Sequence, residues 1–194
     1  MRNLSFIFDY ICPYCYLMIP EIRRLEEEQG FDVEWIPMEI HADTPIEGVS
    51  LLEYLGPRKV IKAGKLLDEL AAAKEIPFYL PEKLYNTQLV NRLTAYGRSR
   101  VNQGELIDEV FRRVFVYNEN ISNDEIVYKI SLNLGLSYDD FVEYIKKQSF
   151  TGTASRWESI VQKQRINVVP TLLEGSSIIC QGVCSYDELV KMLK

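Results

Sequence analysis

The spacing of apolar residues changes twice within the first 40 positions and predicts a strand, a helix and a second strand. Residues 4–8 form a short apolar run that suits a strand buried in a sheet. Over residues 13–29, apolar positions recur every three or four residues between charged ones, and Gly30 follows as a helix stop signal. Residues 31–38 alternate between apolar and polar side chains, which is typical of a strand.

Between about residues 48 and 166 the pattern becomes helical, and we find no convincing strand signal there. Glycine, proline and asparagine residues interrupt it, and Ser122 followed three residues later by Glu125 resembles a capping box that opens a helix. The predicted helical segments are 50–75, 87–103, 105–117, 123–134, 138–147 and 152–165. We therefore predict one helical block in this part of the chain.

Two strands and a helix are predicted after the helical block. Residues 168–173 and 178–182 have the composition of strands, and the polar residues 174–177 between them suit a tight turn. Ser185 and Glu188 form a capping box signature for a final helix. The predicted order is βαβ, a helical insert, then ββα, which is an α/β fold.

The composition limits the classes of partner. The chain has 194 residues, of which 47% are hydrophobic and 26% charged, enough for an apolar core. A net charge of −6 argues against nucleic acid as a partner. The N-terminal residues lack a secretory signal pattern and no apolar run is long enough to span a membrane, so we expect a cytoplasmic protein with no membrane partner. Since His41 is the only histidine, we expect no multi-histidine metal site.

Cys12-Pro13-Tyr14-Cys15 lies between the first predicted strand and the first predicted helix. Pro13 suits the first helical turn, which makes Cys12 the cap residue. Unpaired backbone amides and the helix dipole favour a thiolate at that position, so Cys12 is the predicted nucleophile. Cys15 is carried to the same face by one helical turn and is the predicted resolving thiol. The pair is suited to two-step thiol-disulfide exchange.

These features together resemble the thioredoxin fold: a strand, the Cys-Pro-Tyr-Cys motif, a helix that contains Pro20, and Val169-Pro170-Thr171 at the start of a late strand. The resemblance implies that the bond before Pro170 is cis and lies against the cysteine pair. It also implies that the backbone of Val169 pairs with an extended substrate. The predicted substrate-binding residues are Pro13, Tyr14, Val169 and Pro170.

The long helical insert narrows the resemblance to the DsbA-like, FrnE-like branch, which is related to 2-hydroxychromene-2-carboxylate isomerase and kappa-class glutathione transferase. Asn86-Thr87 and Asn91-Arg92-Leu93 are similar to segments of that group, with Asn91 in the place of a histidine, and Asp9 is also similar. The supporting residues implied are Asp9, Asn86 and Asn91. The implied domains are a thioredoxin-like domain, residues 1–47 and 166–194, and a helical insert, residues 48–165.

The resemblance implies a thiol-disulfide oxidoreductase with no bound cofactor, which acts on protein thiols or disulfides or uses glutathione as a co-substrate. One alternative is a glutathione-dependent transferase or isomerase, in which Cys12 stands where those enzymes use serine to hold glutathione. Another is a zinc-stabilised binding domain whose four ligands are all cysteines. The ligands in that alternative would be Cys12, Cys15, Cys180 and Cys184.

Cys180 and Cys184 have two interpretations. They could form a second redox-active pair, which requires a turn that Gly182 would allow. Alternatively, Cys180 packs in an apolar strand, and Cys184 packs just before the cap residue Ser185. We expect the second case, with reduced and largely structural thiols, because a cytosolic thiol pool disfavours structural disulfides.

Overall fold

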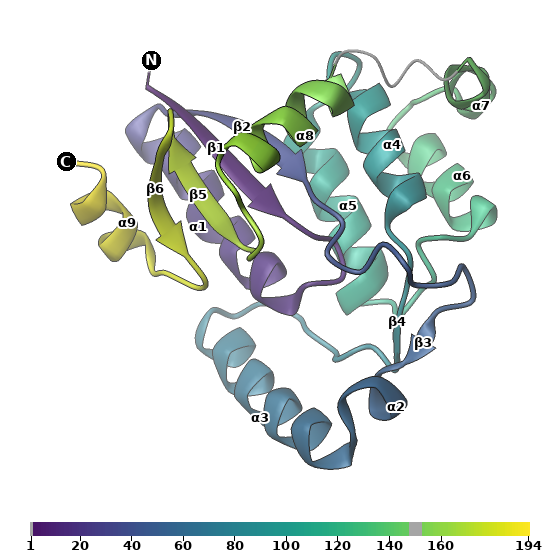
Figure 1. Ribbon diagram of the computed structural model, residues 1–194, viewed down its shortest axis with the longest axis horizontal. Coiled ribbons are helices and arrows are strands. Elements are labelled where there is room, and N and C mark those ends of the chain that lie inside the picture. Colours follow the sequence, from purple (N-terminus) through teal and green to yellow (C-terminus); the bar gives the residue numbers. More distant parts are fainter. Residues whose placement is uncertain (1, 148–152) are drawn as a thin grey trace. The chain divides into compact units, whose positions relative to one another are not determined.

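The computed structural model describes residues 2–147 and 153–194 and divides into two compact units (Figure 1). The first unit comprises Met1–Ile40 and Arg156–Lys194, and the second comprises His41–Ser155. These boundaries differ from the predicted ones, because residues 41–47 join the second unit and residues 156–165 join the first. Helix α8, Thr153–Lys163, is tied to strand β2 by Trp157, whose Nε1 donates to Glu34 Oε1 at 3.1 Å.

The first unit contains a four-stranded sheet in the order β2-β1-β5-β6. Its strands are β1 (Asn3–Phe8), β2 (Asp32–Pro37), β5 (Thr171–Glu174) and β6 (Ser177–Gln181). β1 runs parallel to β2 and antiparallel to β5, which is antiparallel to β6. The crossover between β1 and β2 is helix α1, Pro13–Gln29, and the chain closes with helix α9, Tyr186–Met192. The predicted thioredoxin fold is therefore confirmed.

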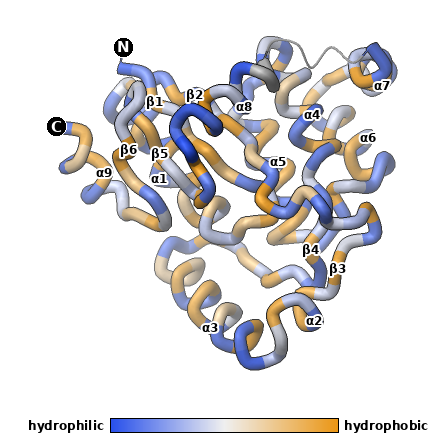
Figure 2. Tube along the Cα trace, viewed as in Figure 1, coloured by the Kyte–Doolittle hydropathy of each residue, from blue (hydrophilic) through white to orange (hydrophobic). Residues whose placement is uncertain are grey.

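Strand β1 lies in the centre of the apolar core of this unit. Phe6, Ile7 and Phe8 are all fully buried, and Figure 2 shows the hydrophobic residues of the sheet in orange. A strand covered on both faces has no polar side, which explains why β1 is a continuous apolar run rather than an alternating one. The ring of Trp35 on β2 meets the ring of Phe6 edge to face, with 5.5 Å between their centroids.

Both ends of α1 are where the sequence predicts them. Pro13 occupies the first helical turn, where its missing N–H would have had no helical partner. Gly30 ends the helix in the left-handed conformation, with φ of +69°, and its N–H donates to the carbonyl of Glu26. The helix also contacts α9, where the Gln29 side chain donates to Tyr186 Oη at 2.9 Å.

The second unit is largely helical. Its helices are α2 (Leu51–Leu55), α3 (Pro57–Ala73), α4 (Gln88–Gly97), α5 (Gln103–Phe115), α6 (Asp124–Asn133) and α7 (Tyr138–Lys146). The predicted helix 50–75 is wrong as one element, since Gly56, with φ of +78°, separates α2 from α3. The unit also contains an antiparallel strand pair, β3 (Val49–Ser50) and β4 (Lys83–Leu84). We predicted no strand here, because two-residue strands are too short to show alternation.

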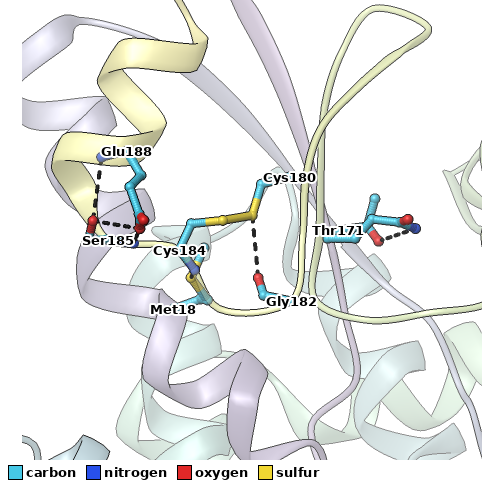
Figure 3. The surroundings of a disulfide bond; sticks show 8 residues. Met18, Thr171, Cys180, Gly182, Cys184, Ser185 and Glu188 are labelled. Atoms are coloured by element: carbon cyan, nitrogen blue, oxygen red, sulfur yellow. Dashed lines mark hydrogen bonds between the residues drawn. A yellow bond between two sulfur atoms is a disulfide. The ribbon is translucent and has the colours of Figure 1, made fainter.

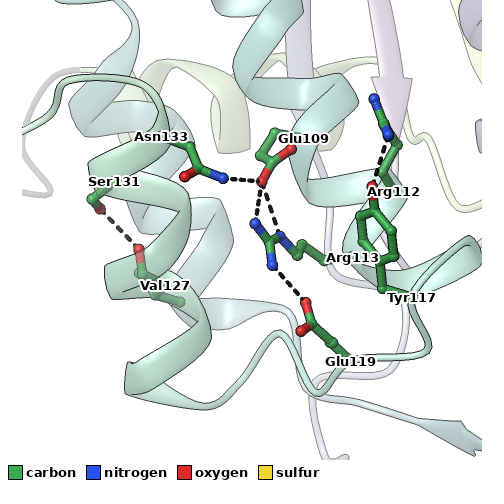
Figure 4. Close-up of polar contacts among 8 residues, drawn as sticks. All are labelled: Glu109, Arg112, Arg113, Tyr117, Glu119, Val127, Ser131 and Asn133. Carbon is green, nitrogen blue, oxygen red and sulfur yellow. Dashed lines mark hydrogen bonds and ion pairs between the residues drawn. The ribbon is translucent and has the colours of Figure 1, made fainter.

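The second unit contains a partly buried ion-pair network centred on Arg113 of α5 (Figure 4). Its guanidinium pairs with Glu109 one turn earlier and with Glu119 Oε2 at 2.9 Å. Asn133, at the end of α6, donates from Nδ2 to Oε1 of the same Glu109 carboxylate at 3.0 Å. This partly buried network links α5, the loop after it and α6. Of the helices that the structure describes, none is both long and apolar enough to cross a membrane.

The two predicted capping boxes have different outcomes. At α9, the Ser185 side chain accepts from the Glu188 N–H and the Glu188 carboxylate accepts from the Ser185 N–H, as predicted. At α6 the prediction is wrong, because Asn123 is the cap residue and its side chain accepts from the Glu125 N–H. The Ser122 hydroxyl instead donates to the carbonyl of Ile46 at 3.1 Å.

Candidate active site

Cys12 is the residue that caps the N-terminus of α1. It has an extended backbone, with φ of −87° and ψ of 111°, and Pro13 begins the helix directly after it. Its carbonyl accepts from the N–H groups of Cys15 and Tyr16, at 3.0 and 3.2 Å, which closes the first turn. The Cys12 thiol is therefore at the positive end of the helix, as the sequence predicts for the nucleophile.

The two thiols of the motif ionise in opposite directions. A hydrogen bond from the Cys15 thiol lowers the pKa of Cys12, and the backbone amides of Cys15 and Tyr14 lower it further against the opposing effect of burial. Complete burial raises the pKa of Cys15 well above its usual range, and the hydrogen bond to Cys12 and the Cys12 charge add to this. Of the two thiols, Cys12 is therefore the one that ionises first. Both cysteines are free thiols in this structure.

Asp9 shapes the loop between β1 and the cysteine motif. The residue is fully buried, and its Oδ2 accepts from the Ile40 N–H at 2.8 Å while Oδ1 lies 3.4 Å from the donating Ile11 nitrogen. Its backbone carbonyl accepts from the Cys12 N–H at 3.0 Å. The carboxylate charge raises the pKa of both Cys12 and Cys15. Asp9 therefore acts on the thiols through both loop geometry and charge.

A loop 157 residues later in the chain lies beside the Cys12 thiol. The bond between Val169 and Pro170 is cis, as the resemblance implies, and Cys12 Sγ is 3.9 Å from the Val169 carbonyl oxygen. The Thr171 hydroxyl donates to the carbonyl of Val168 at 2.7 Å. Val169 and Pro170 are both buried, whereas Pro13 and Tyr14 at the start of α1 are half-buried.

Cys180 and Cys184 form a disulfide (Figure 3), so the expectation of two reduced thiols is wrong. The pairing depends on Gly182, whose φ of +85° produces a tight turn and brings the two Cα atoms to 7.0 Å. It also contradicts the four-cysteine zinc alternative, because these two sulfurs are bonded to each other rather than available as thiolates. Within the described residues, we find no group of three or more histidine, cysteine or carboxylate side chains that could hold a metal ion.

Asn86 and Asn91 belong to the second unit. The Asn86 side chain donates to the carbonyl of Thr44 at 3.0 Å and accepts from the Gln88 N–H at 2.9 Å, which fixes the chain before α4. Asn91 donates to Thr87 Oγ1 at 3.3 Å, while its own Oδ1 is buried without a hydrogen-bond partner among the described residues. A supporting role for either residue in catalysis stays a prediction.

Sequence reasoning missed the residues that hold the loop around Val169. Gln181 Nε2 donates to Thr171 Oγ1 at 3.3 Å, and the Gly182 N–H donates to the Pro170 carbonyl at 2.9 Å. Both residues lie inside the ring that the Cys180–Cys184 disulfide closes. The only signal in the sequence was Gly182 between two cysteines, which indicates a turn but not its partner.

The sheet topology and a cysteine pair at the start of α1, beside a cis-proline loop, define a thioredoxin-fold protein with a thiol pair. The family model described as the DSBA-like thioredoxin domain matches residues 3–194. The chain therefore belongs to the DSBA-like thioredoxin domain family, whose members are thiol-disulfide oxidoreductases and include some isomerase relatives.

Individual relatives are distant in sequence but similar over most of their length. The chain is 22% identical over 183 residues to 2-hydroxychromene-2-carboxylate isomerase from Pseudomonas sp. (strain C18). This alignment covers 90% of this chain and 82% of the isomerase. A probable DsbA oxidoreductase from Streptomyces coelicolor has the same fold with a TM-score of 0.86, at 17% identity over 100% of this chain and 88% of the other.

A third relative is the cytosolic disulfide reductase DsbM from Pseudomonas aeruginosa, whose structure was solved with glutathione. Its TM-score is 0.70 at 12% identity, over 98% of this chain and 96% of the other. The two solved structures show that the fold is shared.

Proposed function

We propose that this protein is a thiol-disulfide oxidoreductase in which Cys12 is the nucleophile and Cys15 the resolving thiol. The observation that carries this proposal is the placement of the two free thiols: Cys12 caps the N-terminus of α1 beside the Val169 carbonyl, and Cys15 is fully buried one helical turn later. The lowered pKa of Cys12 favours its thiolate over that of Cys15, and the raised pKa of Cys15 favours a protonated thiol there until the second step, which supports this order of attack.

The exchange occurs in two steps. In the first, the Cys12 thiolate attacks one sulfur of a substrate disulfide, the substrate S–S bond breaks, and the other substrate sulfur leaves and takes a proton. In the second, Cys15 loses its proton and attacks Cys12 Sγ, which forms a Cys12–Cys15 disulfide and releases the remaining substrate sulfur as a thiol. Two electrons pass to the substrate, and the reverse sequence oxidises a substrate dithiol. Asp9 is the proposed acceptor of the Cys15 proton.

The loop at Val169 is the proposed docking site for the substrate backbone. Its carbonyl oxygen is 3.9 Å from Cys12 Sγ, so a chain that pairs with Val169 would present its sulfur to the nucleophile. We assign protein thiols and disulfides, or glutathione, as partners, and the mechanism requires no bound cofactor. The glutathione in the DsbM structure supports the glutathione assignment. A cytoplasmic location is part of the same proposal, and DsbM is described as cytosolic.

A second candidate is a glutathione-dependent isomerase, which the similarity to 2-hydroxychromene-2-carboxylate isomerase favours. In that reaction Cys12 would hold glutathione without a change of redox state. The two candidates differ in their need for Cys15, because disulfide exchange requires a resolving thiol whereas isomerisation does not.

The deciding experiment compares Cys12→Ser with Cys15→Ser after incubation with glutathione disulfide. We expect Cys15→Ser to accumulate a glutathione adduct on the Cys12 peptide in mass spectrometry, since the variant cannot release it internally, and Cys12→Ser to accumulate none. The wild type should form the Cys12–Cys15 disulfide instead. The Cys180–Cys184 peptide is followed in every sample to show where the adduct resides. An adduct on Cys15 in Cys12→Ser would reverse the assignment, and exchange that persists in both variants would exclude it.

A further inference from the structure

The ring closed by the Cys180–Cys184 disulfide donates hydrogen bonds to the loop around Val169. Gly182 belongs to this ring, and its N–H donates to the Pro170 carbonyl in the loop at 2.9 Å. The Gln181 side chain donates to the Thr171 hydroxyl at 3.3 Å, and that hydroxyl donates in turn to the Val168 carbonyl at 2.7 Å. The carbonyls before and after Val169 are thus both engaged. The Val169 carbonyl itself lies next to Cys12 Sγ.

The same ring also contacts the helix that carries the cysteine pair. The Cys184 N–H donates to the thioether sulfur of Met18 at 3.1 Å, and Met18 is buried on α1 one turn after Cys15 (Figure 3). Figure 3 shows Met18 next to Cys184, Gly182 below Cys180, and Thr171 beyond Cys180. The ring of residues 180–184 therefore contacts both parts of the proposed site, the helix that carries the cysteine pair and the loop around Val169.

The disulfide restricts the backbone of this segment. Gly182 is held at φ of +85°, and an open glycine-containing segment has many other conformations available. A covalent ring removes most of these alternatives, so the donors at Gln181 and Gly182 stay in place. When the ring opens, the segment regains conformational entropy, which weakens the hydrogen bonds that it donates to the loop.

We propose that the Cys180–Cys184 disulfide is a redox-sensitive positioning element for the substrate-docking loop. With the disulfide closed, the Val169 carbonyl is held beside Cys12 and an extended substrate binds. A reducing dithiol opens the ring: the S–S bond breaks, two thiols form, and the dithiol gives up two electrons and two protons as it becomes a disulfide. Substrate binding at Cys12 then weakens. This inference rests on the proposed exchange activity of Cys12.

The test compares the full-length wild type with Cys180→Ala/Cys184→Ala in the oxidation of a peptide dithiol, with glutathione disulfide as the terminal oxidant. These oxidising conditions keep the wild-type ring closed, which mass mapping verifies. We expect the KM for the peptide to rise roughly three- to tenfold in the double variant, the size expected for the net loss of a hydrogen bond, with kcat nearly unchanged. The pH dependence of Cys12 alkylation by iodoacetamide should not move, because Cys15 and the α1 amides set it.

Two results would overturn the proposal. An unchanged KM would show that the ring does not position the loop. A loss of turnover at an unchanged KM would show that the second pair relays electrons instead. A wild type without Cys12-dependent turnover would refute the proposed exchange activity itself, which is a separate outcome.

A second variant keeps the test valid if the double variant does not fold. Gln181→Ala leaves the disulfide intact but removes the donor to Thr171, and Ser177→Ala on the same strand is its matched control because both side chains are exposed. We expect the KM to rise about two- to tenfold in Gln181→Ala and to stay at the wild-type value in Ser177→Ala. Equal KM values in the two variants would contradict the role assigned to the ring.

Discussion

Replacement of Cys15 by alanine tests the source of the Cys12 thiolate. The first cause of the lowered pKa of Cys12 is the hydrogen bond that the Cys15 thiol donates to it. Alanine removes this donor but leaves the backbone amides of residues 14 and 15 in place. We therefore expect the pKa of Cys12 to rise in Cys15→Ala while remaining under the influence of the helix N-terminus.

The size of the effect follows from the value of one hydrogen bond to a charged group. Such bonds contribute about 1.5–3 kcal/mol, and a thiol is a weak donor, so the lower end of that range applies. About 1.4 kcal/mol corresponds to tenfold in an equilibrium. At a pH below the midpoint of Cys12 ionisation, the fraction of Cys12 present as thiolate should therefore be about tenfold smaller in Cys15→Ala than in the wild type.

The assay is the rate of iodoacetamide alkylation of Cys12 as a function of pH. Cys15→Ser is the matched control, because its hydroxyl also donates to the thiolate and it also lacks a resolving sulfur. We expect a low midpoint in Cys15→Ser and a higher one in Cys15→Ala. Equal midpoints in the two variants would refute the reasoning, since the helix amides alone would then account for the thiolate.

Two further predictions concern the charges at the site. In Asp9→Asn, the loss of a buried negative charge should increase the rate of Cys12 alkylation at a fixed acidic pH, and a slower rate would contradict this prediction. The same variant loses a charge-assisted acceptor for the Ile40 N–H, which should lower the free energy of unfolding by about 1–2 kcal/mol in denaturant titrations. Because the fold lowers the pKa of Cys12, the thiolate contributes stability that is fully present above the ordinary thiol pKa and is lost as pH falls through the folded-state pKa. The difference in melting temperature between wild type and Cys12→Ser should therefore grow from pH 5 to pH 9 in favour of the wild type, and a difference independent of pH would be evidence against a perturbed Cys12.

The order of elements and the position of the cysteine motif were predictable because they depend on neighbours in the chain. Apolar spacing identified β1, α1 and β2, and Gly30 marked the end of α1. Pro13 placed Cys12 at the helix cap, which is where the structure has it. The cis bond before Pro170 came from a family resemblance rather than from spacing, and the structure has it.

Other features were decided by contacts between residues far apart in sequence. The Cys180–Cys184 disulfide is one, because the turn at Gly182 is fixed by Pro170 and the adjoining Cys184 N–H is held by Met18 on α1. The pairing of β3 with β4 is another, since two residues cannot display a period.

The sequence by itself therefore determined the local elements and the chemistry available at Cys12 and Cys15. Only the tertiary structure decided that Cys180 and Cys184 are joined in a disulfide and that Gly182 and Gln181 donate to Pro170 and Thr171 in the loop beside Cys12. The physical reason is range: helix, cap and strand preferences act within about four residues, whereas the pairing of loops and thiols depends on which distant segments the core brings together.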